Sequence, residues 1–185
     1  MGFTSKGDVE IKVPAGNREL KQVAEKRILG VIIDQNLNFT AHIEHCASKA
    51  ISQITKLNVL TSGLRGANAE LLITLYKSCI RPNLEYAYPV WCSTKDISPL
   101  ERVQYLALRK ACGAMHGTPA SAIDVITRTL PLDLRLNEVL LNGFLKISRK
   151  GNDNHLKAKV LGLLDDNIYM DHRIITPLHK FTMVR

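Results

Sequence analysis

Two groups of side chains in this sequence are of types that bind metal ions. Asp165 and Asp166 are adjacent carboxylates, and carboxylate oxygen is the ligand that Mg²⁺ prefers. His42, His45 and Cys46 gather where a helix is predicted to begin. A zinc site needs three or four protein ligands, and no second ligand pair lies in evident reach of the two histidines. We therefore predict no metal site, and we interpret the aspartate pair as the acidic end of a helix.

Sequence patterns of other catalytic sites are absent. The chain has no Walker glycine loop, no dinucleotide-binding G-x-G-x-x-G and no G-x-S-x-G turn of a serine hydrolase. We therefore predict no catalytic residue in this chain.

Lys49 and Lys56 are the side chains most suited to binding. They are seven residues apart in a predicted helix, which places them two turns apart on one face, away from the apolar stripe. Lysines so arranged can contact phosphates of a duplex, and such contacts position a duplex without reading its sequence. A plain solvated helix face is the alternative interpretation of the same spacing.

The charge balance favours a polyanionic partner. The 185 residues include 25 Lys and Arg against 17 Asp and Glu, a formal net charge of +8. We expect nucleic acid rather than a membrane, because no long basic amphipathic segment and no apolar run of membrane-spanning length is present. The excess is spread along the chain, so the sequence alone marks no single patch.

The cysteines indicate an intracellular protein, in the cytoplasm or the nucleus. Cys46, Cys79, Cys92 and Cys112 show no C-x-x-C spacing, and three of them fall within apolar helical patterns. We expect buried, reduced thiols rather than disulfides or zinc ligands. The chain begins without the apolar core of a signal peptide, and a strand-like segment follows almost at once, as in a piece cut from a longer protein.

The first forty residues predict a small antiparallel β unit. Asp8–Val13 alternates polar and apolar residues, Pro14–Asn17 has turn chemistry, and Leu20–Val23 is a second short strand. Ile28–Ile33 is apolar and β-branched, which predicts a strand buried on both faces. Gly30 inside it indicates a bulge or the close approach of another backbone.

The remainder predicts helices. Thr40 is a candidate N-cap for a helix with Ile43, Ala47, Ile51 and Ile54 on one face. Ser98 and Glu101 form a capping box around Pro99, and Gly113 suits the C-cap of the helix that follows. We expect helices over residues 41–60, 68–80, 82–92, 99–112, 119–128 and 132–149, and a short one over 155–164.

The aromatic stretch around Trp91 predicts the centre of the helical core. We expect Trp91 to pack with Tyr76 and Leu84, although aromatic residues this dense could also stack on bases. Glu85 lies in the same apolar stretch, and we expect it to pair with Arg81 four residues earlier.

Four stretches resemble one known family, in the order in which that family has them. They are K-x-I-L-G-V-x-I-D-x-x-L-x-F-x-x-H-I from Lys26, L-Y-x-S-x-I-x-P-x-L-E-Y-A-x-P-V-W from Leu75, L-E-R-V-Q-x-x-A-L-R-K-x-x-G-A from Leu100, and G-x-x-x-G-T-P-A-S-A-I with a later L-P-L-D-L. This order resembles the segment that follows the catalytic palm in reverse transcriptases of non-LTR (LINE-type, jockey- or I-like) retrotransposons. Ile28 departs from the family, which often has an aromatic residue there.

The resemblance implies a fold and a set of binding residues. Leu29, Gly30 and Val31 would be the primer grip, with Gly30 bare so that a primer backbone can lie against the strand, and Lys49 and Lys56 would follow the same duplex. The implied fold class is α+β, mainly α. Palm-edge and primer-grip strands would fill residues 1–40, a helical thumb 41–115, and a helical connection toward a missing ribonuclease H domain 116–185.

The resemblance also implies a function. The family's catalytic carboxylates hold two Mg²⁺ ions and precede the grip, but no aromatic-x-Asp-Asp precedes Leu29 here and the Asp165-Asp166 pair follows it. The chain would thus be a fragment of an RNA-directed DNA polymerase that grips the template–primer duplex, with no catalytic carboxylates and no cofactor of its own. Its partners would be that RNA/DNA duplex and the upstream palm and fingers. The alternative is a non-enzymatic helical module, domesticated or unrelated, that binds RNA or a protein.

Overall fold

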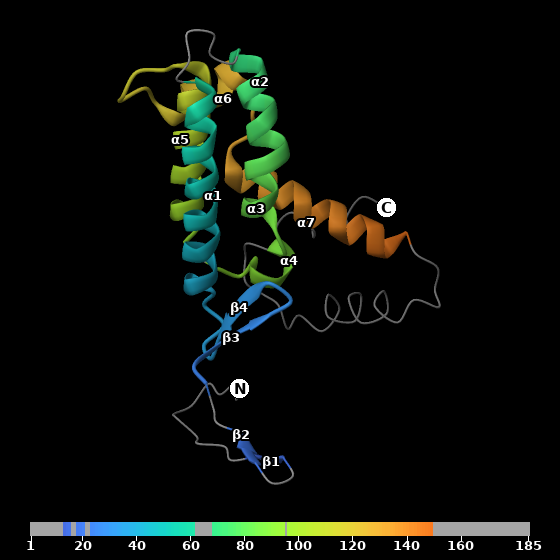
Figure 1. The fold of residues 1–185 in the computed structure, drawn as a ribbon. Helices are drawn as coiled ribbons and strands as arrows, with labels where there is room; N and C mark the ends of the chain where they lie inside the picture. Colours follow the sequence, from blue (N-terminus) through green and yellow to red (C-terminus); the bar gives the residue numbers. More distant parts are fainter. Residues whose placement is uncertain (1–12, 16–17, 21–22, 62–67, 95, 150–185) are drawn as a thin grey trace.

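The computed structural model describes residues 13–15, 18–20, 23–61, 68–94 and 96–149. Within these ranges the chain is mainly helical, with short antiparallel strands before the first long helix (Figure 1), so the predicted α+β, mainly α class is confirmed. The predictions for Asp8–Lys12, for the helix over 155–164 and for the Asp165-Asp166 pair lie outside the described residues.

The strands form two separate antiparallel pairs. β1 (Val13–Ala15) pairs with β2 (Arg18–Leu20), so Pro14 and Ala15 belong to a strand rather than to the predicted turn. β3 (Glu25–Ile28) pairs with β4 (Val31–Asp34). Only the second pair leads directly into the helices.

The predicted single strand over Ile28–Ile33 is wrong. Ile28 pairs with Val31, so Leu29 and Gly30 are the two-residue turn of a hairpin. Both have positive φ, 49° and 88°, as a type I′ turn requires, and this turn matches the right-handed twist of paired strands. The exposed, charged β3 therefore folds back on β4 instead of continuing it.

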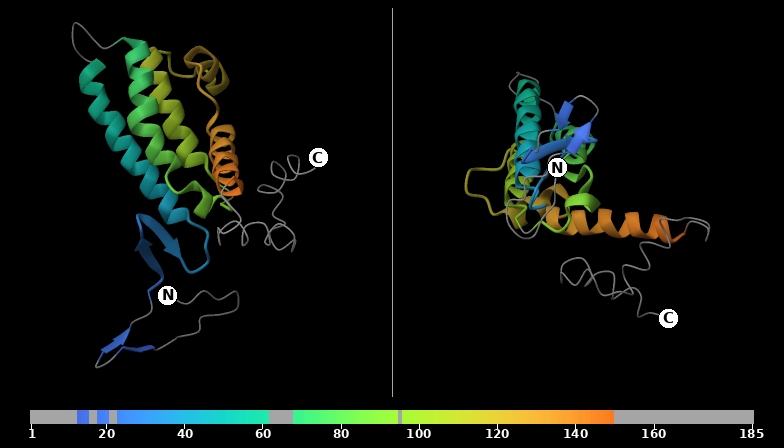
Figure 2. Two further views of the ribbon diagram at one scale, coloured as in Figure 1. Left: turned by 90° about the vertical axis from the view of Figure 1, so that its right-hand side faces the viewer. Right: turned by 90° about the horizontal axis from the view of Figure 1, so that it is seen from below.

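Three helical segments lie side by side, running up, down and up in Figure 1 and in the left view of Figure 2. The first is α1 (Thr40–Thr61) and the third is α5 (Ser98–Cys112). The middle segment is continuous through α2 (Ala69–Leu75), η1 (Tyr76–Ile80) and α3 (Arg81–Glu85). The prediction that a new helix begins at Pro82 is therefore wrong.

A π turn inside the middle segment changes which side chains face the core. The Arg81 N–H donates to the Tyr76 carbonyl, a spacing of five residues, just before Pro82. The ring of a proline crowds the preceding turn of a helix, and a wider turn gives that ring room. Ile80 consequently lies in the core, and Cys79 is exposed. Of the four thiols predicted to be buried, Cys46 is buried and Cys92 and Cys112 are half-buried.

The predicted helix over 82–92 is broken. α3 ends at Glu85, and α4 (Tyr88–Trp91) begins after Ala87, whose φ is 55°. Pro89 cannot supply an N–H to an uninterrupted helix. The Tyr86 carbonyl accepts the indole N–H of Trp91 at 2.9 Å instead, so the break is closed by a side chain.

Trp91 is the centre of the core, as predicted. Trp91, Tyr76 and Leu84 are all at most 1% exposed. Trp91 makes edge-to-face contacts with Tyr88, at 4.8 Å between ring centroids, and with His42, at 5.9 Å. Ile51 was expected on the buried stripe of α1 but is exposed. The buried stripe of α1 is therefore narrower than predicted.

The last two helices share the core of the first three. α6 (Ala120–Thr127) contributes Ile123, and α7 (Leu132–Ser148) contributes Leu132 and Leu136. One hydrophobic cluster thus runs from β4 to α7, and the thumb–connection boundary at residue 115 stays a prediction.

Glu85 forms the predicted ion pair with Arg81, at 3.2 Å. It is also bound by Arg135 from α7 through two hydrogen bonds, at 2.7 and 3.1 Å. The start of α5 differs slightly from the prediction: Ile97 is the N-cap, and Asp96 accepts from the N–H of Ser98.

Candidate nucleic-acid interface

The hairpin of β3 and β4 presents its turn at the edge of the molecule. Leu29 is 90% exposed, whereas Val31 is 5% exposed and packs in the core. Of the three predicted grip residues, Leu29 is therefore at the surface and Val31 is not. Only the tip of this segment offers its side chain to a ligand.

The tip is held by Tyr86, which is 57 positions away in the sequence. The Tyr86 hydroxyl donates to the Leu29 carbonyl at 2.8 Å. A Cβ placed on Gly30 would lie 3.2 Å from a carbon of the Tyr86 ring. Gly30 is therefore bare on a side that the Tyr86 ring fills, and its contact with a primer backbone stays a prediction.

The base of the hairpin is attached to α1 through His42. Nδ1 of this buried imidazole accepts from the Ile32 N–H at 3.4 Å, and Nε2 lies 3.6 Å from the Cys46 sulfur. An accepting Nδ1 is unprotonated, so the hydrogen of the neutral ring is on Nε2, toward Cys46. Burial lowers the pKa of His42, and the nearby charges of His45 and Arg27 lower it further.

Asp34 fixes the turn between the hairpin and α1. Its carboxylate accepts from the N–H groups of Phe39 at 2.9 Å and Asn38 at 3.1 Å. Burial alone would raise the pKa of Asp34, but these backbone hydrogen bonds outweigh it and lower the pKa. The carboxylate thus orders the turn in which Phe39 enters the core.

The predicted lysines lie on an exposed face of α1. Lys49 and Lys56 are both exposed, and His45 and Ser52 share their face at helical spacing. Seven residues of helix correspond to a rise of about 10 Å. Successive phosphates of one strand are about 3.4 Å apart along a B-form axis, so the two lysines can reach phosphates about three steps apart.

The hairpin adds a third cation to this surface. Burial raises the pKa of the Cys46 thiol, and the charges of Lys49 and Arg27 both oppose that rise. Arg27 is exposed on β3, directly opposite Ile32, whose N–H binds His42, and so lies near the N-terminal end of α1. No side-chain hydrogen bond or ion pair of Arg27, Lys49 or Lys56 occurs within the described ranges. We call these three residues the basic surface.

The sequence marked Lys49 and Lys56 but missed Arg27 and Tyr86. Arg27 joins the lysines only because the chain folds back at Leu29 and Gly30. The signals that could have found it are the adjacent basic pair Lys26-Arg27 and the Leu-Gly step that follows, since glycine is the usual source of positive φ in a two-residue hairpin turn.

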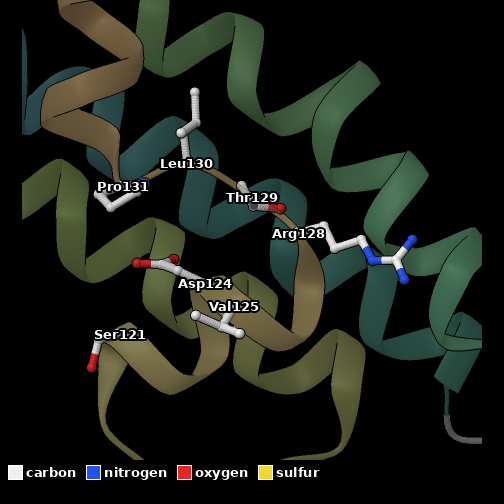
Figure 3. A pocket seen from close by; sticks show the side chains of 7 residues that line it. All are labelled: Ser121, Asp124, Val125, Arg128, Thr129, Leu130 and Pro131. Atoms are coloured by element: carbon white, nitrogen blue, oxygen red, sulfur yellow. The ribbon is translucent and has the colours of Figure 1, made fainter.

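A pocket of about 480 Å³ lies at the other end of the bundle, beside α6 (Figures 1 and 3). Burial raises the pKa of Asp124 in its wall, and a hydrogen bond from Gln104 opposes this. Gln104 also donates to the Leu130 carbonyl at 3.0 Å and accepts from Tyr76, so these polar groups tie helices together. The pocket is lined by Ser121, Asp124, Val125, Arg128, Thr129, Leu130 and Pro131.

Two further features are absent from the residues that the structure describes. No three His, Cys, Asp or Glu side chains come together there in a way that could hold a metal ion. No helix in these ranges has both the length and the apolar character needed to cross a bilayer.

Two curated proteins are similar to this chain. The retrovirus-related Pol polyprotein from type-1 retrotransposable element R1 4 of Nasonia vitripennis is 25% identical over 160 residues, 84% of this chain and 39% of that protein. The RNA-directed DNA polymerase from mobile element jockey of Drosophila funebris is 30% identical over 97 residues, 51% of this chain and 11% of that protein. No family model and no solved structure matches. The chain is thus related to non-LTR retrotransposon polyproteins, as the resemblance predicted, and spans less than half the length of either relative.

Proposed function

We propose that this chain is the part of a retrotransposon RNA-directed DNA polymerase that holds the template–primer duplex, and that the catalytic carboxylates belong to another part of that polymerase. In this proposal the β3–β4 hairpin is the primer grip and α1 to α5 are the thumb. α6 and α7 begin the connection toward a ribonuclease H domain. The similarity to the R1 and jockey proteins supports the choice of family.

The observation that carries the proposal is the basic surface. Arg27 comes from the hairpin and Lys49 and Lys56 from α1, and all three are exposed. Cations without acidic partners are available for phosphates, and each contact releases counterions from the nucleic acid. Such contacts go to the backbone, so we expect binding that does not depend on base sequence.

The hairpin tip has a revised part in this proposal. Tyr86 covers Gly30 on one side, so a primer strand would pass over the exposed Leu29 side chain instead of lying against the glycine. Val31 supports the tip from the core and makes no contact with the duplex.

A salt titration of binding to a labelled RNA–DNA hybrid tests the proposal. We expect weak binding by the 185-residue chain, with a Kd in the range of roughly 10⁻⁴–10⁻⁶ M that is usual for non-specific contacts. Each phosphate contact adds about 0.9 to the slope of log K against log salt for B-form DNA, so Lys49→Ala/Lys56→Ala should lower the slope by nearly two.

The matched control is Arg102→Ala/Lys146→Ala, which also removes two exposed cations, but from α5 and α7. It should leave the slope of the parent chain nearly unchanged. A parent chain that ignores the hybrid at low salt would overturn the proposal. Equal losses of slope in the two double variants would show that net charge, and not the basic surface, attracts the nucleic acid.

A further inference from the structure

We propose that Tyr86 is the residue that positions the hairpin tip for nucleic-acid binding. It would set the place of Arg27 relative to Lys49, without itself contributing a charge. The inference rests on the proposed function, because it concerns how the same basic surface is assembled. It assigns a role to a side chain that lies outside the hairpin and outside α1.

One side chain makes contact with both residues of the turn. The Tyr86 hydroxyl binds the Leu29 carbonyl at 2.8 Å, and its ring lies against Gly30. Leu29 has a φ of 49°, which is unfavourable for a non-glycine residue, so an external hydrogen bond at its carbonyl helps to fix the turn. A side chain at position 30 would crowd the ring, since its Cβ would lie 3.2 Å from a ring carbon.

The main chain of Tyr86 is fixed by the core, while its side chain is 51% exposed. It stands at the break between α3 and α4, where its carbonyl accepts the indole N–H of the fully buried Trp91. The next residue, Ala87, has a φ of 55°, and this sharp change of direction aims the tyrosine at the hairpin. A main-chain hydrogen bond thus links the core to Tyr86, whose half-exposed side chain reaches a turn at the surface.

Two hydrogen bonds attach the hairpin to the helices in addition to the packing of Val31 in the core, and both are needed to fix the direction of β3. One is the hydrogen bond from the Ile32 N–H to His42, and Ile32 lies directly opposite Arg27 in the strand pair. The other joins the tip to Tyr86. All four residues of β3 are exposed, so β3 packs little against the helices. With the tip released, the hairpin can pivot about Ile32, and Arg27 moves with it.

The first measurement compares Tyr86→Phe with Tyr105→Phe. Each variant removes one hydroxyl that donates to a main-chain carbonyl, that of Leu29 in one case and that of Thr118, at 3.0 Å, in the other. We expect about five-fold faster amide hydrogen exchange in the hairpin for Tyr86→Phe, the size expected for one lost hydrogen bond, and about five-fold weaker binding to an RNA–DNA hybrid. Tyr105→Phe should change neither.

The second measurement asks whether Tyr86 acts through Arg27. Tyr86→Phe is combined with Arg27→Ala and, separately, with Lys56→Ala. The five-fold loss of binding should disappear when Arg27 is absent and should persist when Lys56 is absent, because only Arg27 is carried by the hairpin. A general loss of stability would weaken binding equally in both backgrounds.

The outcomes separate this inference from the proposed function. A parent chain that does not bind the hybrid overturns the proposed function and, with it, the role of Tyr86 in binding. A parent chain that binds, with Tyr86→Phe equally harmful whether or not Arg27 is present, overturns the inference alone. So does unchanged binding by Tyr86→Phe together with faster hairpin exchange, because the contact would then hold the turn without positioning the basic surface.

Discussion

His42 joins three parts of the protein through one imidazole ring. Its Nδ1 accepts from β4, its Nε2 faces Cys46 one turn later in α1, and its ring edge meets Trp91 from α4. The first contact requires Nδ1 to be unprotonated. The attachment of the hairpin therefore depends on the charge of a single buried side chain.

We predict that the free energy of unfolding falls as the pH drops below about 6.5. Burial, with smaller contributions from His45 and Arg27, lowers the pKa of His42 from its ordinary value of 6.5. The unfolded chain then binds a proton at a higher pH than the folded chain, so this stability is complete above pH 6.5 and is lost as the pH falls toward the folded pKa. The loss cannot exceed about 1.4 kcal/mol per pH unit for one proton.

Urea unfolding at a series of pH values measures this effect. His42→Gln should flatten the dependence below pH 6.5, because glutamine does not titrate. His116→Gln is the control, since His116 is exposed and makes no hydrogen bond or ion pair with another described residue. A dependence that survives in His42→Gln and disappears in His116→Gln would refute the assignment.

At the scale of helices and strands, the elements that depend on local sequence signals could be predicted, and contacts between distant residues could not. The predicted helices over 41–60, 99–112, 119–128 and 132–149 agree closely with α1, α5, α6 and α7. Helical periodicity and a C-cap such as Gly113, with its φ of 67°, act within a few residues. They can therefore be recognised without knowing the rest of the fold.

The break after Glu85 is closed nearby, by the Trp91 indole five residues after Tyr86. The strand predicted over Ile28–Ile33 was wrong because its turn at Leu29 and Gly30 is completed by Tyr86, 57 positions away in the sequence. The same holds for the candidate site. The spacing of Lys49 and Lys56 could be read from one helix, whereas Arg27 comes to the start of α1 only because the hairpin folds back.

The connection between α3 and α7 gives a prediction about elements. Arg135 binds both carboxylate oxygens of Glu85. Both side chains are largely covered, with 24% of Arg135 and 15% of Glu85 exposed. Arg135→Lys keeps the charge but loses the paired hydrogen bonds, so we expect it to cost about 1–2 kcal/mol of unfolding free energy. Chemical denaturation of the variant and the parent chain measures the difference.

Glu138→Gln is the control for this prediction. Glu138 accepts from the same Arg135 at 2.9 Å but is 47% exposed, so its loss should cost no more than about 0.5 kcal/mol. Similar costs for the two variants would mean that the Glu85–Arg135 contact does not hold α7 against α3 more strongly than a surface pair does.

At the scale of the whole molecule, binding and catalysis are expected to be separable. One core joins the hairpin to α7, so the described part can present its basic surface as a unit. That surface contains cations and no paired carboxylates. Polymerase chemistry needs the opposite kind of group, carboxylates that hold two metal ions against the attacking and leaving oxygens.

We predict that the purified 185-residue chain binds an RNA–DNA hybrid but does not extend its primer. No aromatic-x-Asp-Asp sequence precedes Leu29, and the relatives extend well beyond the matched segment. The measurement is primer extension with Mg²⁺ and all four deoxynucleotides, at a salt concentration at which binding to the same hybrid is observed. We expect no product above that of a mock preparation from the same host.

Two controls make a negative result informative. An active reverse transcriptase added to the same reaction must extend the primer, which shows that the hybrid is a competent substrate in the presence of this chain. The variant Lys49→Ala/Lys56→Ala serves as the second control, because a contaminating polymerase would not depend on these lysines. Extension that is absent in the mock preparation and falls with the loss of the two lysines would establish that the chain contains an active site of its own.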